Sequence, residues 1–478
     1  MVQKILGTLI MWYGATLVPP MLVSMLYRDG QLPVFFIAAA LIASAGFLLW
    51  FPARAVQHEL SLREGFLVVA AFWLVLGPIA ATPFLLAEAP AMSFTEAVFE
   101  AVSGLTTTGA TALTGLDALP ASILYYRQQI CWAGGLGIVV LAVAVLPMLG
   151  LGGMQLYKAE SPGQSKDKLT PRIKETAKAL WIVYLGLTCL CALAYWLAGM
   201  TLFDAIGHAF TTIATAGFST HDASLAHWDS PLIEGIAVLF MILGGTNFAL
   251  HFVVWRKLDP RNYLADAELS FFLSVTLAFI ALITVYLWAA GTYPTLLEAL
   301  RFGGVNYVSM ATTTGYATAA FDQWPGFVPM LLILVGFMGA CAGSSSGGIK
   351  SIRLLIMFRQ TVAEFRRLLH PRAEVPVTID GRAVPDRVVQ AIFGYFGVYI
   401  VVFVVLFLAL LTTGLDYVSA FTGLASCMNG VGPGLGSVFV HVQGVTEAGK
   451  WILTLAMILG RLEIYTLIIL LTPEFWRR

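Results

Sequence analysis

Four glycine-containing segments carry the residue types with the clearest potential chemistry in this chain. They read LTTTGA at 105–110, IATAGF at 213–218, MATTTGY at 310–316 and NGVGP at 429–433. Their glycines stand roughly one hundred residues apart, a period longer than that of solenoid repeats, and this predicts four related sites. Successive backbone carbonyls of four converging strands could replace the hydration shell of a dehydrated cation. Glycine suits such strands because it allows the φ angles that turn a carbonyl toward an axis.

Two interpretations of these segments differ in function. A Thr-Gly pair can cap a helix or let two helices pack closely, and for a single segment this is the more ordinary role. Four copies at similar intervals favour a selectivity filter for potassium. The apolar stretches before the segments, such as 94–105 and 201–213, are too short to span a bilayer. As half-length helices, they would point their negative C-terminal ends at the cation.

The amino-acid composition predicts the environment in which these segments lie. With 59% hydrophobic residues and only 11% charged residues, a chain of 478 residues lacks the polar surface of a soluble globule. We therefore expect an all-α polytopic membrane protein. The net charge of +0 argues against a nucleic-acid partner. Residues Cys131, Cys189, Cys191, Cys341 and Cys427 lack metal-type or disulfide spacing and are expected to be packing residues.

The apolar stretches predict ten membrane spans and four half-length helices. We expect two extra N-terminal helices (1–63) and four parallel repeats, each of a helix, a half-length helix, a loop and a second helix. The repeats are expected at 64–155, 156–262, 263–379 and 380–478. The spans are expected at about 5–26, 34–51, 65–87, 126–149, 177–199, 232–255, 268–290, 325–358, 388–412 and 450–472.

Loop charges predict the orientation of the chain. Basic residues gather in the loops that join one repeat to the next, whereas acidic residues such as Asp117 and Asp222 accompany the glycine segments. Because Lys and Arg concentrate in cytoplasmic loops, the glycine segments should lie on the outer side, with both termini inside. The basic residues are Lys158, Lys166, Lys168, Arg172, Lys174, Lys178, Arg256, Lys257, Arg261, Lys350, Arg353, Arg359, Arg366, Arg367 and Arg372.

A glycine-serine stretch at 343–348 interrupts the last span of the third repeat. Small polar residues at membrane depth are expected to face a cavity or the interior of the protein. The stretch is not a phosphate-binding loop, because Ile349 stands where that motif requires lysine and no strand precedes it. A loop that faces the pore and a plain flexible break remain the two interpretations.

Arg461 is a charged residue in the last apolar span. A charge at that depth faces a cavity or a partner, and Glu463 or nearby carbonyl groups could be that partner. Asn247 and His251 in another span are expected to be hydrogen-bonded packing residues.

The sequence resembles the Trk/Ktr/HKT superfamily of potassium transporters, and within it the membrane subunits of bacterial Trk uptake systems. The resemblance covers essentially the whole chain, including GMQLYKAESPG at 153–163 and CAGSSSGGIK at 341–350. It implies four M1-P-M2 units around one pore that takes up potassium across the bacterial inner membrane. In the fourth unit Gly432 is favoured over Gly430 as the counterpart of the other glycines. The implied filter residues are Thr107, Thr108, Gly109, Ala110, Thr215, Ala216, Gly217, Phe218, Thr313, Thr314, Gly315, Tyr316, Gly430, Val431, Gly432 and Pro433.

The resemblance also implies a gate and partners. An intramembrane loop would close the pore below the filter, and the arginine would repel cations there. The only metal implied is potassium, held by filter carbonyls, with no covalent cofactor. The implied partners are a second copy of the chain and a cytoplasmic ring of TrkA-type subunits, which would carry the nucleotide. The gate residues are Gly343, Ser344, Ser345, Ser346, Gly347, Gly348, Lys350 and Arg461.

Two other functions are alternatives to a gated potassium pathway. A symporter coupled to protons or sodium would usually show inverted repeats, whereas these repeats run parallel. A membrane-embedded enzyme needs convergent acid, base or nucleophile groups, and the chain offers only scattered candidates such as Glu234 and Asp266. The dense basic loops either dock the cytoplasmic ring or only set the topology.

Overall fold

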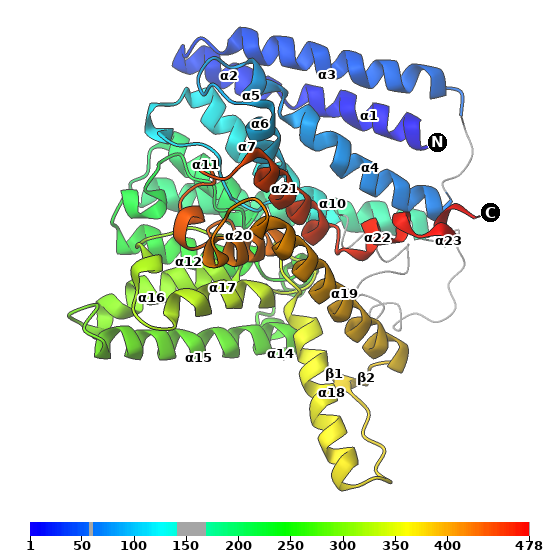
Figure 1. Ribbon diagram of the computed structural model, residues 1–478, viewed down its shortest axis with the longest axis vertical. Helices are drawn as coiled ribbons and strands as arrows, with labels where there is room; N and C mark the ends of the chain where they lie inside the picture. Colours follow the sequence, from blue (N-terminus) through cyan, green and yellow to red (C-terminus); the bar gives the residue numbers. More distant parts are fainter. Residues whose placement is uncertain (57–60, 141–168, 478) are drawn as a thin grey trace.

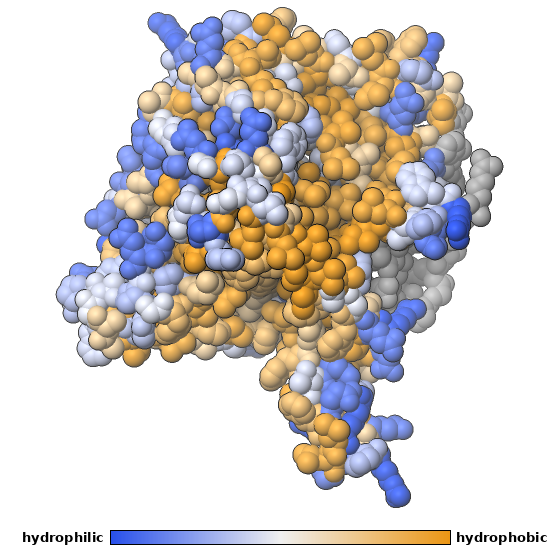
Figure 2. Space-filling view, in the orientation of Figure 1, coloured by the Kyte–Doolittle hydropathy of each residue, from blue (hydrophilic) through white to orange (hydrophobic). Residues whose placement is uncertain are grey.

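The computed structural model describes residues 1–56, 61–140 and 169–477. The motif at 153–163, the basic residues Lys158, Lys166 and Lys168, and the expected boundary at 155 lie outside these residues. Most helices run side by side along one direction, and the two termini lie at the same end (Figure 1). Figure 2 shows hydrophobic residues over the middle of one face, with hydrophilic residues toward its left and right ends.

Helices occupy the expected N-terminal segment and each of the four expected units. Before the first unit come α1 (Val2–Ala15), α2 (Val18–Tyr27) and α3 (Leu32–Ala53). The first unit contains α4 (Leu62–Ala80), α5 (Thr82–Leu86), α6 (Phe94–Leu105), η1 (Leu116–Ala118) and α7 (Ala121–Val140). The second contains α10 (Leu169–Leu197), α11 (Leu202–Ile213), η4 (Ser224–His227), α12 (Pro231–Gly244) and α13 (Phe248–Lys257).

The third and fourth units are joined by a segment that extends from the helical body (Figure 1). The third unit contains α14 (Arg261–Ala265), α15 (Ala267–Ala289), α16 (Leu296–Ala311), η5 (Phe321–Gln323), α17 (Val328–Met338) and the extending α18 (Ser351–Leu369). A two-stranded antiparallel hairpin, β1 (Thr378–Ile379) and β2 (Arg382–Ala383), follows. The fourth unit contains α19 (Asp386–Leu411), α20 (Tyr417–Asn429), η6 (Gly436–Val438), α21 (Glu447–Arg461), α22 (Tyr465–Leu471) and α23 (Pro473–Trp476).

The half-length helices α6, α11, α16 and α20 begin at capped residues. Ser93 caps α6 through a capping box with Glu96, and Thr201, Thr295 and Asp416 cap the other three. Each capping side chain accepts a hydrogen bond from a free N–H of the first turn, and this defines where the helix starts. The helices contain 12, 12, 16 and 13 residues, so none is long enough to span a bilayer.

Two expected spans are strongly bent, which the sequence analysis did not foresee. The span expected at 232–255 bends by 96° between α12 and α13, and that at 450–472 bends by 107° between α21 and α22. Gly244, the last residue of α12, and Gly460, the residue before the last of α21, lie in close contact with backbone: a Cβ on Gly244 would lie 2.9 Å from the Ile213 oxygen, and one on Gly460 1.8 Å from the Met428 oxygen. The bends therefore arise where these helices pass beneath the half-length helices.

Six helices among the described residues are long and apolar enough to cross a membrane, and each bent pair adds one more for a total of eight. Of the other two expected spans, 126–149 runs into residues outside the described part. The span expected at 325–358 consists of α17, a loop and α18. The chain is thus a helical protein with many apolar helices, while ten spans and the repeat boundaries stay predictions.

Candidate functional site

The four half-length helices end in the same backbone geometry. In the first unit the Thr107 N–H donates to the Gly104 carbonyl at 2.9 Å, and the Thr108 N–H donates to the Ser103 carbonyl at 2.8 Å. This pair of bonds is the Schellman arrangement, which requires a positive φ just past the helix. The long bond recurs in the other units with the N–H groups of Ala216, Thr314 and Val431 as donors.

Positive φ angles occur at two alternate positions in each extended segment. The first position is threonine in three units, where a β-branched side chain is strained, and glycine in the fourth. The second position is glycine in all four. This pattern aligns Gly432 with the glycines of the other units and Gly430 with the threonines. The φ angles are 54°, 49°, 56° and 66° at Thr107, Thr215, Thr313 and Gly430, and 82°, 68°, 87° and 103° at Gly109, Gly217, Gly315 and Gly432.

The four segments pack into a closed ring, which we call the glycine ring (residues 107–110, 215–218, 313–316 and 430–433). Each second-position glycine lies against the carbonyl oxygen of the next unit, and a Cβ atom there would overlap that oxygen. The contacts run from unit one to two, three, four and back to one. The distances from the added Cβ are 2.1 Å for Gly109 to Ala216, 2.0 Å for Gly217 to Thr314, 1.9 Å for Gly315 to Val431 and 2.8 Å for Gly432 to Thr108.

One polar side chain on each half-length helix hydrogen-bonds to the segment that follows the ring. In three units this residue stands nine positions before the ring glycine, and in the fourth it stands ten before. Sequence reasoning missed these residues, although the constant spacing was a usable signal. The pairs are Glu100 with the Ala112 N–H, His208 with the Ser219 hydroxyl, Asn306 with the Thr318 hydroxyl and Thr422 with the Leu435 N–H, at 2.9, 2.9, 2.8 and 2.8 Å.

Arg127 and Glu100 form a buried ion pair beside the ring. Arg127 Nε lies 2.7 Å from Glu100 Oε1, and the two side chains are 1% and 0% exposed. Arg127 also donates to the Ser219 carbonyl at 3.0 Å and lies 3.9 Å from the centre of the Phe218 ring. The pair thereby connects the first unit to the second where the chain leaves the ring.

Ion pairs also link the other units. Arg301 of the third unit pairs with Glu234 of the second at 2.7 Å, and Lys450 of the fourth pairs with Glu96 of the first at 2.8 Å. A third pair, between Arg353 and Glu463 at 2.5 Å, joins the third unit to the fourth. These three ion pairs join units two and three, four and one, and three and four, whereas the hydrogen bond from Arg127 to Ser219 joins units one and two.

The loop at 339–350 lies against one end of the glycine ring, where it meets the first-position residues Thr215 and Thr313. In the second unit, Thr215 donates to the Ser345 hydroxyl at 3.2 Å. In the third, Thr313 accepts a hydrogen bond from the Gly347 N–H at 2.7 Å. The expected gate residues are therefore brought directly beneath the expected filter residues.

The fourth unit also contacts the loop. The Gly348 N–H donates to the Asn429 carbonyl at 2.9 Å, and a Cβ on Gly347 would lie only 2.0 Å from that oxygen. In the first unit the Thr107 hydroxyl is buried and has no hydrogen-bond partner among the described residues. The loop thus hydrogen-bonds to three of the four units.

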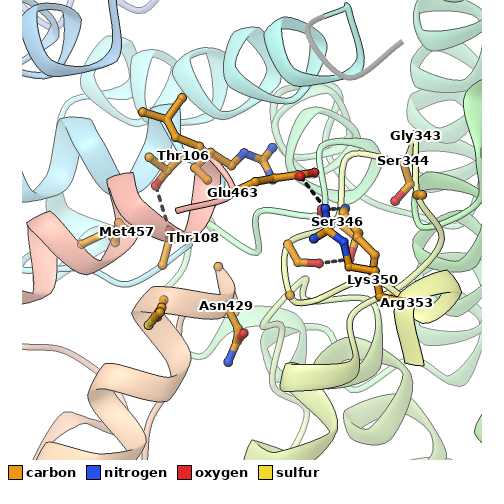
Figure 3. Close-up of a pocket in the computed structure, with 18 of the residues that line it drawn as sticks. Thr106, Thr108, Gly343, Ser344, Ser346, Lys350, Arg353, Asn429, Met457 and Glu463 are labelled. Carbon is orange, nitrogen blue, oxygen red and sulfur yellow. Dashed lines mark hydrogen bonds and ion pairs between the residues drawn. The ribbon is translucent and has the colours of Figure 1, made fainter. Parts of the chain in front are cut away.

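A cavity of about 60 Å³ lies between the ring, the loop and the end of α21 (Figure 3). Thr106 and Thr108 line it on the ring side, whereas Ser346 and Lys350 come from the loop. The Lys350 ammonium donates to the Ser346 carbonyl and so closes the loop on itself. A space of this size holds only a few water molecules.

Arg461, the last residue of α21, also lines this cavity. Its Nη1 donates to the Ser345 carbonyl at 2.9 Å, while Nε and Nη2 have no hydrogen-bond partner among the described residues. Pairing with Glu463, one of the two partners considered from the sequence, is wrong because Glu463 pairs with Arg353. The carbonyl contact is present. The guanidinium charge of Arg461 therefore lies beside the loop, and the nearby Glu463 carboxylate is paired with Arg353 instead.

Glu268 secures both ends of the loop, and sequence reasoning missed it. This buried carboxylate, in the first turn of α15, accepts from the Ala342 N–H at 2.6 Å and from the Ile352 N–H at 3.1 Å. The two donors lie on either side of the glycine-serine stretch. The loop is consequently a held structure, which disfavours the interpretation as a plain flexible break.

The candidates for other chemistry have structural partners instead. Both ring nitrogens of His251 are hydrogen-bonded, at 2.7 and 2.8 Å, and Asn247 caps α13, as expected for packing residues. Glu234 pairs with Arg301, while Asp266 caps α15 by accepting from a backbone N–H at 2.8 Å. Glu234 and Asp266 thus serve separate structural contacts.

A family model described as TrkH, cation transport protein, matches residues 31–478. The chain therefore belongs to the TrkH family. It is 47% identical over 479 residues to the Trk system potassium uptake protein TrkH of Halomonas elongata, covering 100% of this chain and 99% of that protein. The Trk system potassium uptake protein TrkH of Escherichia coli K12 is likewise 47% identical over 481 residues, with 100% and 99% covered.

The fold of the TrkH family is also found in a solved relative. The crystal structure of the potassium transporter TrkH from Vibrio parahaemolyticus matches this structure with a TM-score of 0.93 at 46% identity, covering 100% of this chain and 99% of that chain. The resemblance inferred from the sequence motifs is thereby confirmed, as is the expectation of a helical membrane protein. The roles of the filter and gate residues remain predictions.

Proposed function

We propose that this TrkH-family protein takes up potassium across the bacterial inner membrane through the glycine ring. The observation that carries this proposal is the cyclic packing, in which every ring glycine contacts a carbonyl of the next unit. Strands packed in this way around one axis can offer rings of carbonyl oxygens to a dehydrated potassium ion. The similar proteins of H. elongata and E. coli are named potassium uptake proteins.

The electrostatics of the half-length helices support a cation rather than an anion. All four helices end at the ring, so their partial negative C-terminal charges lie next to the ion. The ring is not fourfold symmetric, since glycine replaces threonine at position 430 and valine stands at 431. We therefore expect weaker discrimination among potassium, rubidium and sodium than in a symmetric filter.

The loop at 343–348, with Lys350 and Arg461, is the gate in this proposal. Its hydrogen bonds to Thr313 and Asn429 hold it across the inner end of the ring. The guanidinium of Arg461 adds a positive charge to the cavity that a potassium ion would enter next, and like charges repel strongly where water is scarce. Opening requires the loop to leave the ring and Arg461 to move away from the pathway.

The proposed assembly is a homodimer on a cytoplasmic ring of TrkA-type nucleotide-binding subunits, with both termini cytoplasmic. The position of α18 supports it, because this helix carries the exposed Arg366 and the half-buried Arg367 away from the helical body (Figure 1). Such charges attract phosphate groups and acidic side chains over a Debye length of about 10 Å at 0.1 M salt. Nucleotide is expected on the partner only.

Flux through purified protein in liposomes tests the proposed function. Opposed gradients of potassium, sodium and protons are imposed, and the reversal potential is measured. If conduction is passive, the reversal potential should change with the potassium gradient and should not change with the proton gradient. A reversal potential that moves with the proton or sodium gradient would indicate coupled symport, and a lack of potassium flux would contradict the proposal.

A further inference from the structure

A second cavity, of about 300 Å³, lies on the side of the glycine ring away from the loop. The ring glycines of all four units line its floor, and the chain segments that leave the ring form its walls. In the proposed orientation it is the outer vestibule through which a cation would reach the ring. Its wall includes His221, which has no role in the proposed conduction pathway.

His221 belongs to a cluster of three side chains that spans two units, and it is the member that lines the cavity. Asp117 comes from η1 of the first unit, while His221 and His227 come from the loop that follows the ring in the second. One ligand atom of each lies within 4.8 Å of the others. The His221 and His227 rings are stacked, with centroids 3.6 Å apart and planes 6° from parallel. Of the two rings, His221 hydrogen-bonds to the Asp117 carboxylate, and His227 lies stacked on His221.

The cluster is held in place by its surroundings. Trp228 packs edge-on against both imidazoles, with centroid distances of 5.1 Å to His221 and 4.9 Å to His227. Asp222 accepts from the Gly115 N–H at 3.0 Å and so ties the second-unit loop to the first-unit loop. The two loops are therefore held together before any ligand arrives, and only the stacked imidazoles must turn so that their in-plane lone pairs converge on one ion.

The two nitrogens of His221 face different carboxylates. Nδ1 donates to Asp117 Oδ1, and Nε2 lies 3.4 Å from Asp204 Oδ1 with no hydrogen-bond partner among the described residues. A metal-bound histidine characteristically presents its other N–H to a carboxylate, which fixes the tautomer. If the ring proton moves from Nδ1 to Nε2, Nδ1 becomes free for a metal and the new N–H points at Asp204.

We infer that Asp117, His221 and His227 form a binding site for a divalent transition-metal ion such as Zn²⁺ at the outer mouth of the vestibule. Two imidazoles and one carboxylate are a common zinc ligand set, with water completing the coordination. Carboxylate and imidazole together select such ions over potassium.

Occupation of this site would slow potassium entry, an expectation that rests on the proposed function. A bound ion adds positive charge to the vestibule, which lowers the local concentration of cations at the ring. It also links the first-unit and second-unit loops at the mouth.

Calorimetric titration of ZnCl2 into the purified, chelator-treated full-length protein tests the site. We expect one Zn²⁺ per chain, with affinity weakened about tenfold or more in His227→Ala and in Asp117→Asn. Both positions are exposed, so folding should survive. His441→Ala is the matched control, because His441 lines the same cavity outside the cluster and its loss should leave affinity unchanged. Absence of binding, or equal affinity in all three variants, would overturn the site.

Rubidium uptake into liposomes tests the consequence separately. External Zn²⁺ should inhibit uptake by the parent protein and by His441→Ala, but not by His227→Ala. Zinc binding without inhibition would overturn the proposed effect on entry. A protein that binds Zn²⁺ yet takes up no rubidium without zinc would instead contradict the proposed function.

Discussion

At the residue scale, threonine and glycine share the first positive-φ position of the ring but differ in whether they can hydrogen-bond to the loop. Thr215 and Thr313 adopt positive φ angles, which cost about 1–3 kcal/mol each, but their hydroxyl groups hydrogen-bond to the loop. Gly430 adopts the same conformation without strain and has no hydroxyl to offer. The hydrogen bonds of these strained threonines thus couple the ring to the loop, so a conformational change in the ring should alter the loop, and a change in the loop should alter the ring.

Replacing Gly315 with alanine or serine should impair potassium selectivity. The new Cβ would lie 1.9 Å from the Val431 carbonyl oxygen, and the φ of 87° is unfavourable for any L side chain. We expect lower uptake or a reduced potassium-to-sodium preference in a liposome flux assay. Gly304→Ala is the control, because its Cβ would meet nothing closer than 3.7 Å. Unchanged uptake together with an unchanged potassium-to-sodium preference in Gly315→Ala would contradict the assignment of the ring as a filter.

Replacing Glu100 with glutamine should destabilise the protein strongly. The change keeps the side-chain volume but leaves the buried Arg127 charge unpaired, which typically costs about 3–5 kcal/mol. Thermal unfolding in detergent measures the effect. Glu364→Gln, in the exposed pair with Arg367, is the control and should cost about 1 kcal/mol or less. Equal losses of stability in the two variants would show that the buried pair has no special role.

At the scale of elements, the sequence predicts what local chemistry determines. Ser, Thr and Asp caps mark the starts of the half-length helices, and the glycines mark the ring. The bends after Gly244 and Gly460 were not predictable, because contacts with distant backbone create them. The Arg127–Glu100 pair was missed for a similar reason. Each residue alone resembles an exposed charge, and only the fold brings them together.

Replacing Arg461 with alanine should raise ion flux, because it removes a positive charge and one hydrogen bond that holds the loop. Deletion of residues 343–347 should act in the same direction, although it also removes contacts to the ring. Liposome flux through purified protein is the measurement. Arg366→Ala, at an exposed position of α18, should leave basal flux unchanged. A folded Arg461→Ala variant that conducts no more than the parent would show that Arg461 is not a barrier.

At the scale of the whole molecule, the four units converge on one ring while α18 extends from the body (Figure 1). The similarity of the four segments was visible in the sequence and predicted convergence. The side on which a regulator docks could be predicted only from loop charge, and part of that charge lies outside the described residues. We therefore expect that the ring and the proposed docking surface on α18 can be altered independently.

Charge reversal at Lys166, Lys168, Arg366 and Arg367 should release the cytoplasmic ring. We expect loss of co-purification and of the nucleotide response, with the ion preference retained, and docking of the parent should weaken as salt rises. Reversal at Lys257, an exposed base at the end of α13, should have a smaller effect. Full co-purification with an unaltered nucleotide response would mean that these bases only orient the chain in the membrane.

The most direct test of the account is to locate the ion itself. Crystals soaked in rubidium, a heavier analogue of potassium, give anomalous diffraction that marks each bound ion. The account predicts peaks on the axis of the glycine ring, surrounded by carbonyl oxygens from the segments at 107–110, 215–218, 313–316 and 430–433. Anomalous peaks found only elsewhere in the protein, with the ring axis empty, would contradict the claim that this ring is the potassium pathway.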